Sequence, residues 1–269
     1  MTTAVILTTY NRPDALAAAL EGYLLQDRSD FELIVADDGS TPDTRAVVDA
    51  YSARAAFPVK DVWHEDAGFR AAAIRNRALA TTSAKYVIFT DGDCVPRASF
   101  VTRHLALAER GCFLAGNRIL LSRAFTQRVL RERLPIHEWT AGAWLSARLR
   151  GDVNRVLPLV ELPASPMRKR QPERWEGVKT CNLSAWRDDL LRVNGFDESY
   201  SGWGLEDSDL VIRLLHAGVK HKSARFATPL FHLWHAENDR SRLAENEQRL
   251  GALLASRDIR ALVGADRYL

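Results

Sequence analysis

The feature that most constrains the fold is a repeated order of a short apolar run, a polar turn and an amphipathic stretch. The apolar runs span residues 4–7, 31–36, 59–63 and 86–89. Helices are expected from Pro13, from about Thr41, and over 71–81, 100–108, 138–150 and 207–217, with a late strand over 224–232. Strands that are apolar along their length are typical of parallel sheets covered by helices on both faces. The sequence therefore predicts an α/β fold with one mostly parallel, Rossmann-like sheet.

Polar turns follow the first, second and fourth of these predicted strands. In parallel sheets the carboxyl ends of the strands meet at one edge, where ligands bind. Asp91-Gly92-Asp93 places two carboxylates two positions apart, so they can hold a hard divalent cation together with phosphate oxygens. Asp38 offers a carboxylate for a base or a ribose, and Thr8 and Tyr10 can contact or stack on the base. Each turn alone is equally compatible with ordinary turn and capping residues.

Two acidic residues, Glu206 and Asp207, come at the expected start of a helix. Acids there are favoured by the helix dipole, which is a sufficient structural explanation. The alternative is a catalytic base, because Trp203 lies between two glycines just before the acids and its flat ring suits a sugar. His232 and His235 follow the late strand, and imidazoles can join carboxylates around a transition-metal ion.

Composition excludes some classes of function. A net charge of +3 gives no argument for nucleic-acid binding, and no apolar run approaches the length of about 20 residues that crosses a membrane. Three widely spaced cysteines and the lack of a signal peptide at the N-terminus favour a reducing cytoplasm. The basic stretch 118–174, with its cluster Arg168-Lys169-Arg170, suggests an acceptor on an anionic or lipid surface and peripheral contact with the inner membrane face. An ordinary solvated insertion explains it equally well.

Taken in order, the motifs resemble a known family. Residues 7–13, 35–40 and 89–93 are similar to family 2 glycosyltransferases with a GT-A fold. Residues 202–207 and the two histidines resemble the C-terminal part of β-1,4-galactosyltransferases and chondroitin-type polymerases. The sequence departs from both groups at Leu205, where they usually carry glycine.

The resemblance implies an inverting, metal-dependent transfer of a sugar from a nucleotide-sugar, expected to be a UDP-sugar, to a hydroxyl of a glycan or lipid-linked glycan in bacterial polysaccharide or lipopolysaccharide synthesis. The cofactor is expected to be Mn²⁺ or Mg²⁺. The implied nucleotide-binding residues are Thr8, Tyr10, Arg12, Asp38, Asp66, Arg70, Arg75, Asn76 and Asp91. The implied metal ligands are Asp93 with His232 or His235, and the catalytic pair is the base Asp207 with Glu206. Trp203, Gly204 and Asn182 are expected at the sugar and acceptor.

We expect a single GT-A domain over residues 1–269, with a nucleotide-binding half at 1–110 and an acceptor-binding half at 111–240. A variable helical insertion is expected at about 118–175 and a helical tail at 241–269. A sugar-1-phosphate nucleotidyltransferase is the main alternative. Such enzymes usually carry a Gly-rich basic loop after the first strand, where this chain has Thr8-Thr9-Tyr10-Asn11-Arg12. A non-catalytic sugar-nucleotide-binding module is the other alternative.

Overall fold

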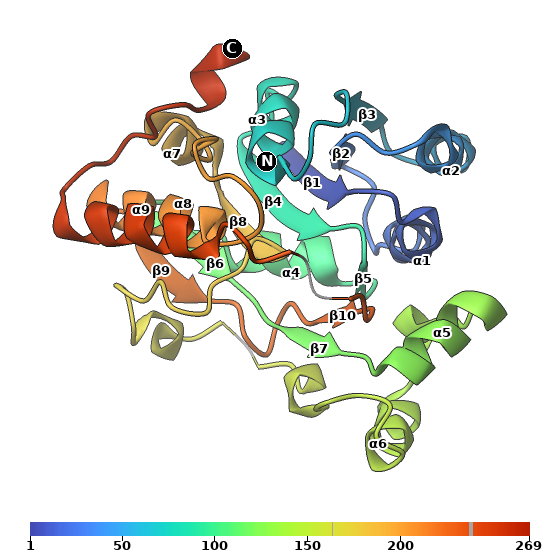
Figure 1. Cartoon of the computed structure of the whole chain (residues 1–269). Coiled ribbons are helices and arrows are strands. Elements are labelled where there is room, and N and C mark those ends of the chain that lie inside the picture. The colour runs from blue at the N-terminus through green and yellow to red at the C-terminus, as the bar shows by residue number, and fades with distance from the viewer. Residues whose placement is uncertain (163, 237–238) are drawn as a thin grey trace.

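A seven-stranded sheet in the order β3-β2-β1-β4-β8-β6-β9 forms the centre of the molecule (Figure 1). The computed structural model describes residues 1–162, 164–236 and 239–269. The strands are β1 (Thr3–Thr9), β2 (Glu32–Asp37), β3 (Val59–Trp63), β4 (Tyr86–Asp91), β6 (Cys112–Ala115), β8 (Asn182–Trp186) and β9 (Lys220–Ser223). Only the β8 pairings with β4 and β6 are antiparallel among the described strand pairs of this sheet. The predicted mostly parallel α/β sheet is confirmed.

The register of the central strands brings their polar ends together. Thr8 at the end of β1 pairs with Ala36 on β2 and with Asp91 on β4. Asp37 lies opposite Thr9. The polar turns after β1, β2 and β4 therefore lie at one edge of the sheet, as predicted.

Helices cover both faces of the sheet. One face carries α1 (Pro13–Leu24), α2 (Pro42–Ser52) and α4 (Phe100–Leu107), and the other carries α3 (Ala71–Ala80), α7 (Arg187–Arg192) and α8 (Glu206–His216). Helices α1 and α2 start with proline, which lacks the N–H that the first helical turn leaves unpaired. The apolar side of α1, including Leu16 and Leu20, is buried against the sheet, as its spacing predicts.

A second, three-stranded sheet was not predicted. It consists of β5 (Cys94–Pro96), β10 (Leu230–His232) and β7 (Arg118–Leu120), with β10 in the middle. The late strand expected over 224–232 is wrong except for its last three residues. The backbone N–H groups of Ala227 and Thr228 both donate to the carbonyl of Ala224, which closes a turn where extended backbone was expected.

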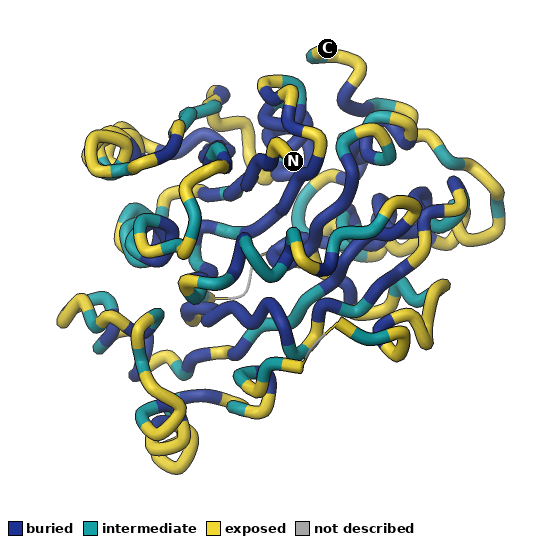
Figure 2. The backbone as a smooth tube through the Cα atoms, turned by 180° about the vertical axis from the view of Figure 1, so that it is seen from behind, coloured by how far each residue is buried: buried dark blue, intermediate teal, exposed yellow. Residues whose placement is uncertain are grey.

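The insertion is helical, with α5 (Arg123–Glu132) and α6 (Ala141–Leu149) and three 3-10 turns, η1 (Ile136–Glu138), η2 (Leu157–Leu159) and η3 (Pro166–Lys169). It packs through Trp144, whose ring stacks on Phe231 of β10 at 4.1 Å between centroids. Phe125 and Val129 of α5 and Ala147 of α6 are also buried, and most other residues of these two helices are exposed or half-buried. The central strands of the main sheet are buried, whereas β3 at one edge is mostly half-buried (Figure 2). The tail forms α9 (Leu243–Ala255), which lies beside α8 (Figure 1), and a last turn η4 (Ala265–Arg267).

The basic cluster at 168–170 is not a uniformly exposed patch. Arg168 is buried, and its guanidinium donates to the carbonyl oxygens of Leu162, Ser223 and Arg225. Lys169 pairs with Glu109. Two of the three cations therefore hold the insertion against its neighbours. Within the described ranges, none of the helices combines the length and the apolar character needed to cross a bilayer.

Candidate active site

The nucleotide end of the site is built around Asp38, directly after β2. The Asp38 carboxylate is buried and accepts a hydrogen bond from the backbone N–H of Arg70 at 2.8 Å. Its other oxygen lies 2.6 Å from Nε2 of the buried His64. Burial raises the pKa of Asp38, while these two partners favour its charged form. His64 was not predicted, because no motif distinguishes it in the sequence.

Tyr10 and Asp66 face each other across the same end of the site. The Tyr10 hydroxyl donates to the Asp66 carboxylate at 3.0 Å, and about half of the Tyr10 side chain is exposed. An exposed aromatic face next to a carboxylate is suited to a nucleobase. Arg12, half-buried at the start of α1, pairs with Asp14 and also lines the cavity.

Arg75, on α3, connects the nucleotide end to the acids of α8. Its guanidinium donates to the Thr8 hydroxyl at 3.0 Å and to Asp91 and Glu206 at 3.3 Å each. It also lies 3.6 Å from an oxygen of Asp207. Burial alone would lower the pKa of Arg75, but the three carboxylates raise it above its ordinary value. Arg75 is therefore a fixed buried cation among four of the predicted site residues.

The Glu206 carboxyl group is buried between Arg75 and Asp207. Burial and the neighbouring Asp207 charge together raise the pKa of Glu206 to about 7, although Arg75 opposes the shift. Asp207 is held differently. It accepts hydrogen bonds from the Thr180 hydroxyl and, at 3.2 Å, from the Thr180 backbone N–H. Thr180, just before β8, was missed because its link to Asp207 spans 27 residues of sequence.

A carboxylate and two imidazoles meet at the other end of the cavity. Nε2 of His232 lies 3.7 Å from one Asp93 oxygen, and Nε2 of His235 lies 3.5 Å from the other. The small sheet causes this approach: His232 pairs with Cys94, and the Leu233 N–H donates to the Asp93 carbonyl. Burial, with Arg118 nearby, lowers the pKa of His232 to about 3, so its imidazole is neutral and keeps a lone pair.

This donor set fits a divalent cation. Adjacent ligands of an octahedral ion with bonds of about 2.1 Å are about 3 Å apart, so the Asp93–His distances need to shrink by only a few tenths of an ångström. Oxygen and imidazole ligands suit Mn²⁺. Buried Cys94 also lies close to Asp93 and His232. Burial raises the pKa of the Cys94 thiol, which disfavours the thiolate that would bind a metal.

These groups line one cavity of about 460 Å³. Of the predicted site residues, it gathers Thr8, Tyr10, Arg12, Asp38, Arg75, Asp91, Asp93, Trp203, Gly204, Glu206, Asp207, His232 and His235. Asp66 and Arg70 adjoin it through Tyr10 and Asp38. A volume of this size is typical of small-molecule sites.

Besides Asp66 and Arg70, two predicted residues do not line this cavity. Asn76 is fully buried, and its amide bonds to the backbone of Phe196 and to Glu198. Asn182 is buried at the start of β8, where its amide bonds to the Asn117 and Thr228 carbonyls. Both amides are hydrogen-bonded within the protein, and Asn182 also lines a neighbouring cavity beside β9.

Leu205 occupies the position where the resembling groups usually carry glycine, and its backbone explains that preference. Its φ of +77° is in the left-handed region that side chains rarely adopt. It lines the cavity between Gly204 and Glu206. Trp203 is partly buried and is covered by the Arg240 guanidinium at 5.2 Å from the ring centre.

Comparison with protein families fits this arrangement. The family model described as "Glycosyl transferase family 2" matches residues 4–162, more than half of the chain. The chain belongs to glycosyl transferase family 2. A second model, described as "N-terminal domain of galactosyltransferase", matches residues 166–236, which include the acids of α8 and both histidines. Both parts of the predicted resemblance are therefore confirmed.

Most of this chain also aligns with named glycosyltransferases. Over 226 residues the chain is 32% identical to a validoxylamine A glucosyltransferase of Streptomyces hygroscopicus subsp. limoneus, covering 80% of this chain and 48% of the relative. It is 26% identical over 225 residues to a chondroitin synthase of Pasteurella multocida, covering 80% of this chain and 23% of that protein. The chain thus spans about half or less of the length of these relatives.

Solved structures share the fold. S. aureus TarS 1–349, in complex with UDP-GlcNAc, has a TM-score of 0.62 at 15% identity, covering 100% of this chain and 69% of TarS. A mannosyltransferase from Pyrobaculum calidifontis, in complex with GDP-Man and Mn²⁺, has a TM-score of 0.62 at 16% identity, covering 94% of this chain and 64% of that one. The GT-A fold is therefore confirmed.

Proposed function

We propose that this chain is an inverting glycosyltransferase that moves a sugar from a UDP-sugar to a hydroxyl of a glycan or lipid-linked glycan. The observation that carries the proposal is the single cavity in which a nucleotide end, a metal-ligand cluster and a carboxylate held by hydrogen bonds lie together. Tyr10 and Asp38 would bind the uracil and ribose, with Asp66 supporting Tyr10. TarS with UDP-GlcNAc supports a uridine donor, although the mannosyltransferase binds a guanosine donor.

Asp93 with His232 and His235 would hold Mn²⁺ or Mg²⁺, and Asp91 would lie nearer the ribose. The bound cation supplies a Lewis acid that stabilises the negative charge developing on the departing UDP. The relative that binds Mn²⁺ supports this cofactor. Asp91 is already paired with Arg75, whereas the Asp93 oxygens point to the histidines, which supports this division of roles.

Asp207 would accept the proton of the attacking hydroxyl, because an alcohol is a poor nucleophile until a base removes its proton. Both of its oxygens accept hydrogen bonds from Thr180, which fixes the carboxylate in place. Attack from the side opposite to the departing UDP would invert the anomeric centre. Glu206, beside Asp207, would bind acceptor hydroxyls, and Trp203 would stack on a sugar ring.

We also propose a division of labour along the chain. Residues 1–110 would bind the donor and 111–240 the acceptor, with the insertion at 118–175 adapting the acceptor side and 241–269 as a helical tail. A place in bacterial surface polysaccharide synthesis agrees with the named chondroitin synthase. A cytoplasmic enzyme with peripheral contact at the inner membrane face is part of the same proposal.

Thermal unfolding with a panel of nucleotide-sugars, each with and without Mn²⁺, tests the proposal. A donor at 100 times its Kd should stabilise the fold by about 2.7 kcal/mol. We expect a UDP-sugar to raise Tm only with Mn²⁺ present, and Asp93→Asn to abolish the increase. Stabilisation by a nucleoside triphosphate and a sugar-1-phosphate, with release of pyrophosphate, would instead support a nucleotidyltransferase. Donor binding without transfer or hydrolysis would support a binding module.

A further inference from the structure

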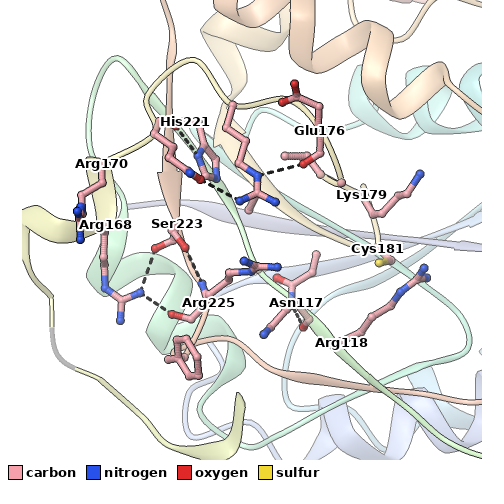
Figure 3. Close-up of a pocket in the computed structure, with 18 of the residues that line it drawn as sticks. Asn117, Arg118, Arg168, Arg170, Glu176, Lys179, Cys181, His221, Ser223 and Arg225 are labelled. Carbon is pink, nitrogen blue, oxygen red and sulfur yellow. Dashed lines mark hydrogen bonds between the residues drawn. The ribbon is translucent and has the colours of Figure 1, made fainter. Parts of the chain in front are cut away.

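A second cavity, of about 820 Å³, adjoins the donor cavity and is larger than it. Figure 3 shows residues that line it. This cavity lies between the insertion and the strands β6 and β9, of which β9 is the edge of the main sheet. Six cationic side chains with no assigned role line it: Arg118, Arg155, Arg170, Arg174, Lys179 and Arg225. Glu176 is the single acidic residue among its described lining residues. In the view of Figure 3, Arg170 lies at one end and Arg118 and Lys179 at the other, with Arg225 between them.

Four of these cations are not paired with a carboxylate. Within the described part of the chain, no carboxylate lies within 4 Å of the charged groups of Arg155, Arg170, Arg174 or Arg225. Arg155 donates to the Arg118 carbonyl instead. Burial and the neighbouring Arg174 and Arg155 charges lower the pKa of Arg225, which shows that like charges are crowded here. Crowded cations without counter-charges repel one another, and a bound anion would relieve that repulsion.

Hydrogen bonds fix the backbone around this cavity, so the cationic side chains project from a rigid surface. The guanidinium of buried Arg168 bonds to the carbonyls of Ser223 and Arg225. Arg174 donates to the Glu176 carbonyl and to the side chain of Gln171. The basic residues of this region therefore have two roles. Arg168 holds the backbone of β9 and of the segment after it in place, and the six cations named above line the cavity.

The second cavity is continuous with the donor cavity. Arg118, Lys179 and Cys181 line both. Asp207, the proposed base, lies at the donor side of this junction and is bonded to Thr180, the residue between Lys179 and Cys181. A ligand in the second cavity thus has one end next to the group that would activate its hydroxyl.

We propose that this basic cavity binds an acceptor that carries phosphate groups, as a phosphodiester or a diphosphate, close to the hydroxyl that receives the sugar. The inference deepens the proposed function and rests on it. Guanidinium groups match phosphate oxygens in pairs, and a diphosphate places two negative charges and more acceptor oxygens in one compact group than a single carboxylate does. Five arginines around one space suit two neighbouring phosphates better than isolated acid groups on a sugar.

The experiment measures binding of inorganic tripolyphosphate by calorimetry while saturating UDP and Mn²⁺ fill the donor cavity. The test variant is Arg155→Gln, Arg170→Gln and Arg225→Gln combined, since these residues line only the second cavity. The control combines Arg148→Gln, Arg192→Gln and Arg257→Gln, which removes the same charge from exposed positions outside both cavities. We expect the Kd for tripolyphosphate to rise by about 10-fold or more in the test variant and to stay unchanged in the control.

Several results would overturn the inference. These are equal losses in both variants, unchanged binding in the test variant, or tripolyphosphate that competes with UDP. Tighter binding of a uronate oligosaccharide of equal charge would also overturn it. The Kd for UDP is measured on every variant. If UDP fails to bind the unaltered protein, the proposed function fails, and if UDP binds but tripolyphosphate does not, only the phosphate inference fails. If the triple variant does not fold, the single variants Arg170→Gln and Arg225→Gln replace it. Each is expected to raise the Kd for tripolyphosphate by less than the triple variant would.

Discussion

Neutralising the buried Glu206 is expected to stabilise the protein at neutral and alkaline pH. The structure places this carboxyl group between a cation and an anion, and burial and Asp207 together outweigh Arg75. In Glu206→Gln the side chain keeps its shape and its Oε1, which can still accept from Arg75. The variant therefore removes the buried charge and leaves the hydrogen bond in place.

The magnitude follows from the pKa. Raising the Glu206 pKa from 4.5 to about 7 means that the folded protein holds this proton more tightly than the unfolded chain. The protonated Glu206 therefore stabilises the folded state fully below pH 4.5, and this stabilisation is lost as the pH rises through 7. One pKa unit is worth about 1.4 kcal/mol, so the full loss is about 3 kcal/mol. Relative to the unaltered protein, Glu206→Gln should gain under about 1 kcal/mol at pH 5 and about 3 kcal/mol at pH 8.

Urea unfolding at several pH values between 5 and 8 measures this difference. Other buried carboxyl groups titrate in both proteins. The difference between the two free energies of unfolding, followed against pH, therefore reports on Glu206 alone. Glu245→Gln is a matched control, because Glu245 is half-exposed on α9 and Arg249 and Arg242 lower its pKa. Its difference curve should be flat between pH 5 and pH 8. Parallel curves for Glu206→Gln and the unaltered protein would refute the reasoning and show that Arg75 fully compensates the burial of the charge.

Three further substitutions test other parts of the site. Asp207→Asn should lower kcat by about 10²-fold without changing the Kd for UDP, and near-normal turnover would remove Asp207 as the base. Thr180→Val should lower kcat by about 10-fold, with Thr180→Ser restoring it; equal kcat values for Val and Ser would mean that the hydroxyl does not position Asp207. His64→Leu removes a partner of buried Asp38, so urea unfolding should show a loss of about 1–3 kcal/mol and calorimetry a weaker affinity for UDP. Unchanged stability and affinity would show that Asp38 does not need this partner.

The sequence carried enough information to predict the first four strands of the main sheet and one edge of the site, whereas β6, β8 and β9 were not predicted. Continuous apolar runs identify buried parallel strands, and the parallel register then places Thr8 and Asp91 side by side without further information. The small sheet could not be predicted, because strands of three residues have too few positions to show alternation. His64 and Thr180 could not be predicted either, since each acts through a carboxylate that is distant along the chain.

The charges of the two cavities explain why the proposed cation would belong to only one of them. Five carboxylate side chains, those of Asp38, Asp91, Asp93, Glu206 and Asp207, line the donor cavity. A diphosphate next to Asp91 and Asp93 would meet like charge unless a divalent ion lay between them, because Arg75 is already shared among three acids. The second cavity has the opposite balance, so an anionic acceptor can bind there without a metal. Arg118 and Lys179, at the junction, lie where the negative charge of both substrates would be greatest.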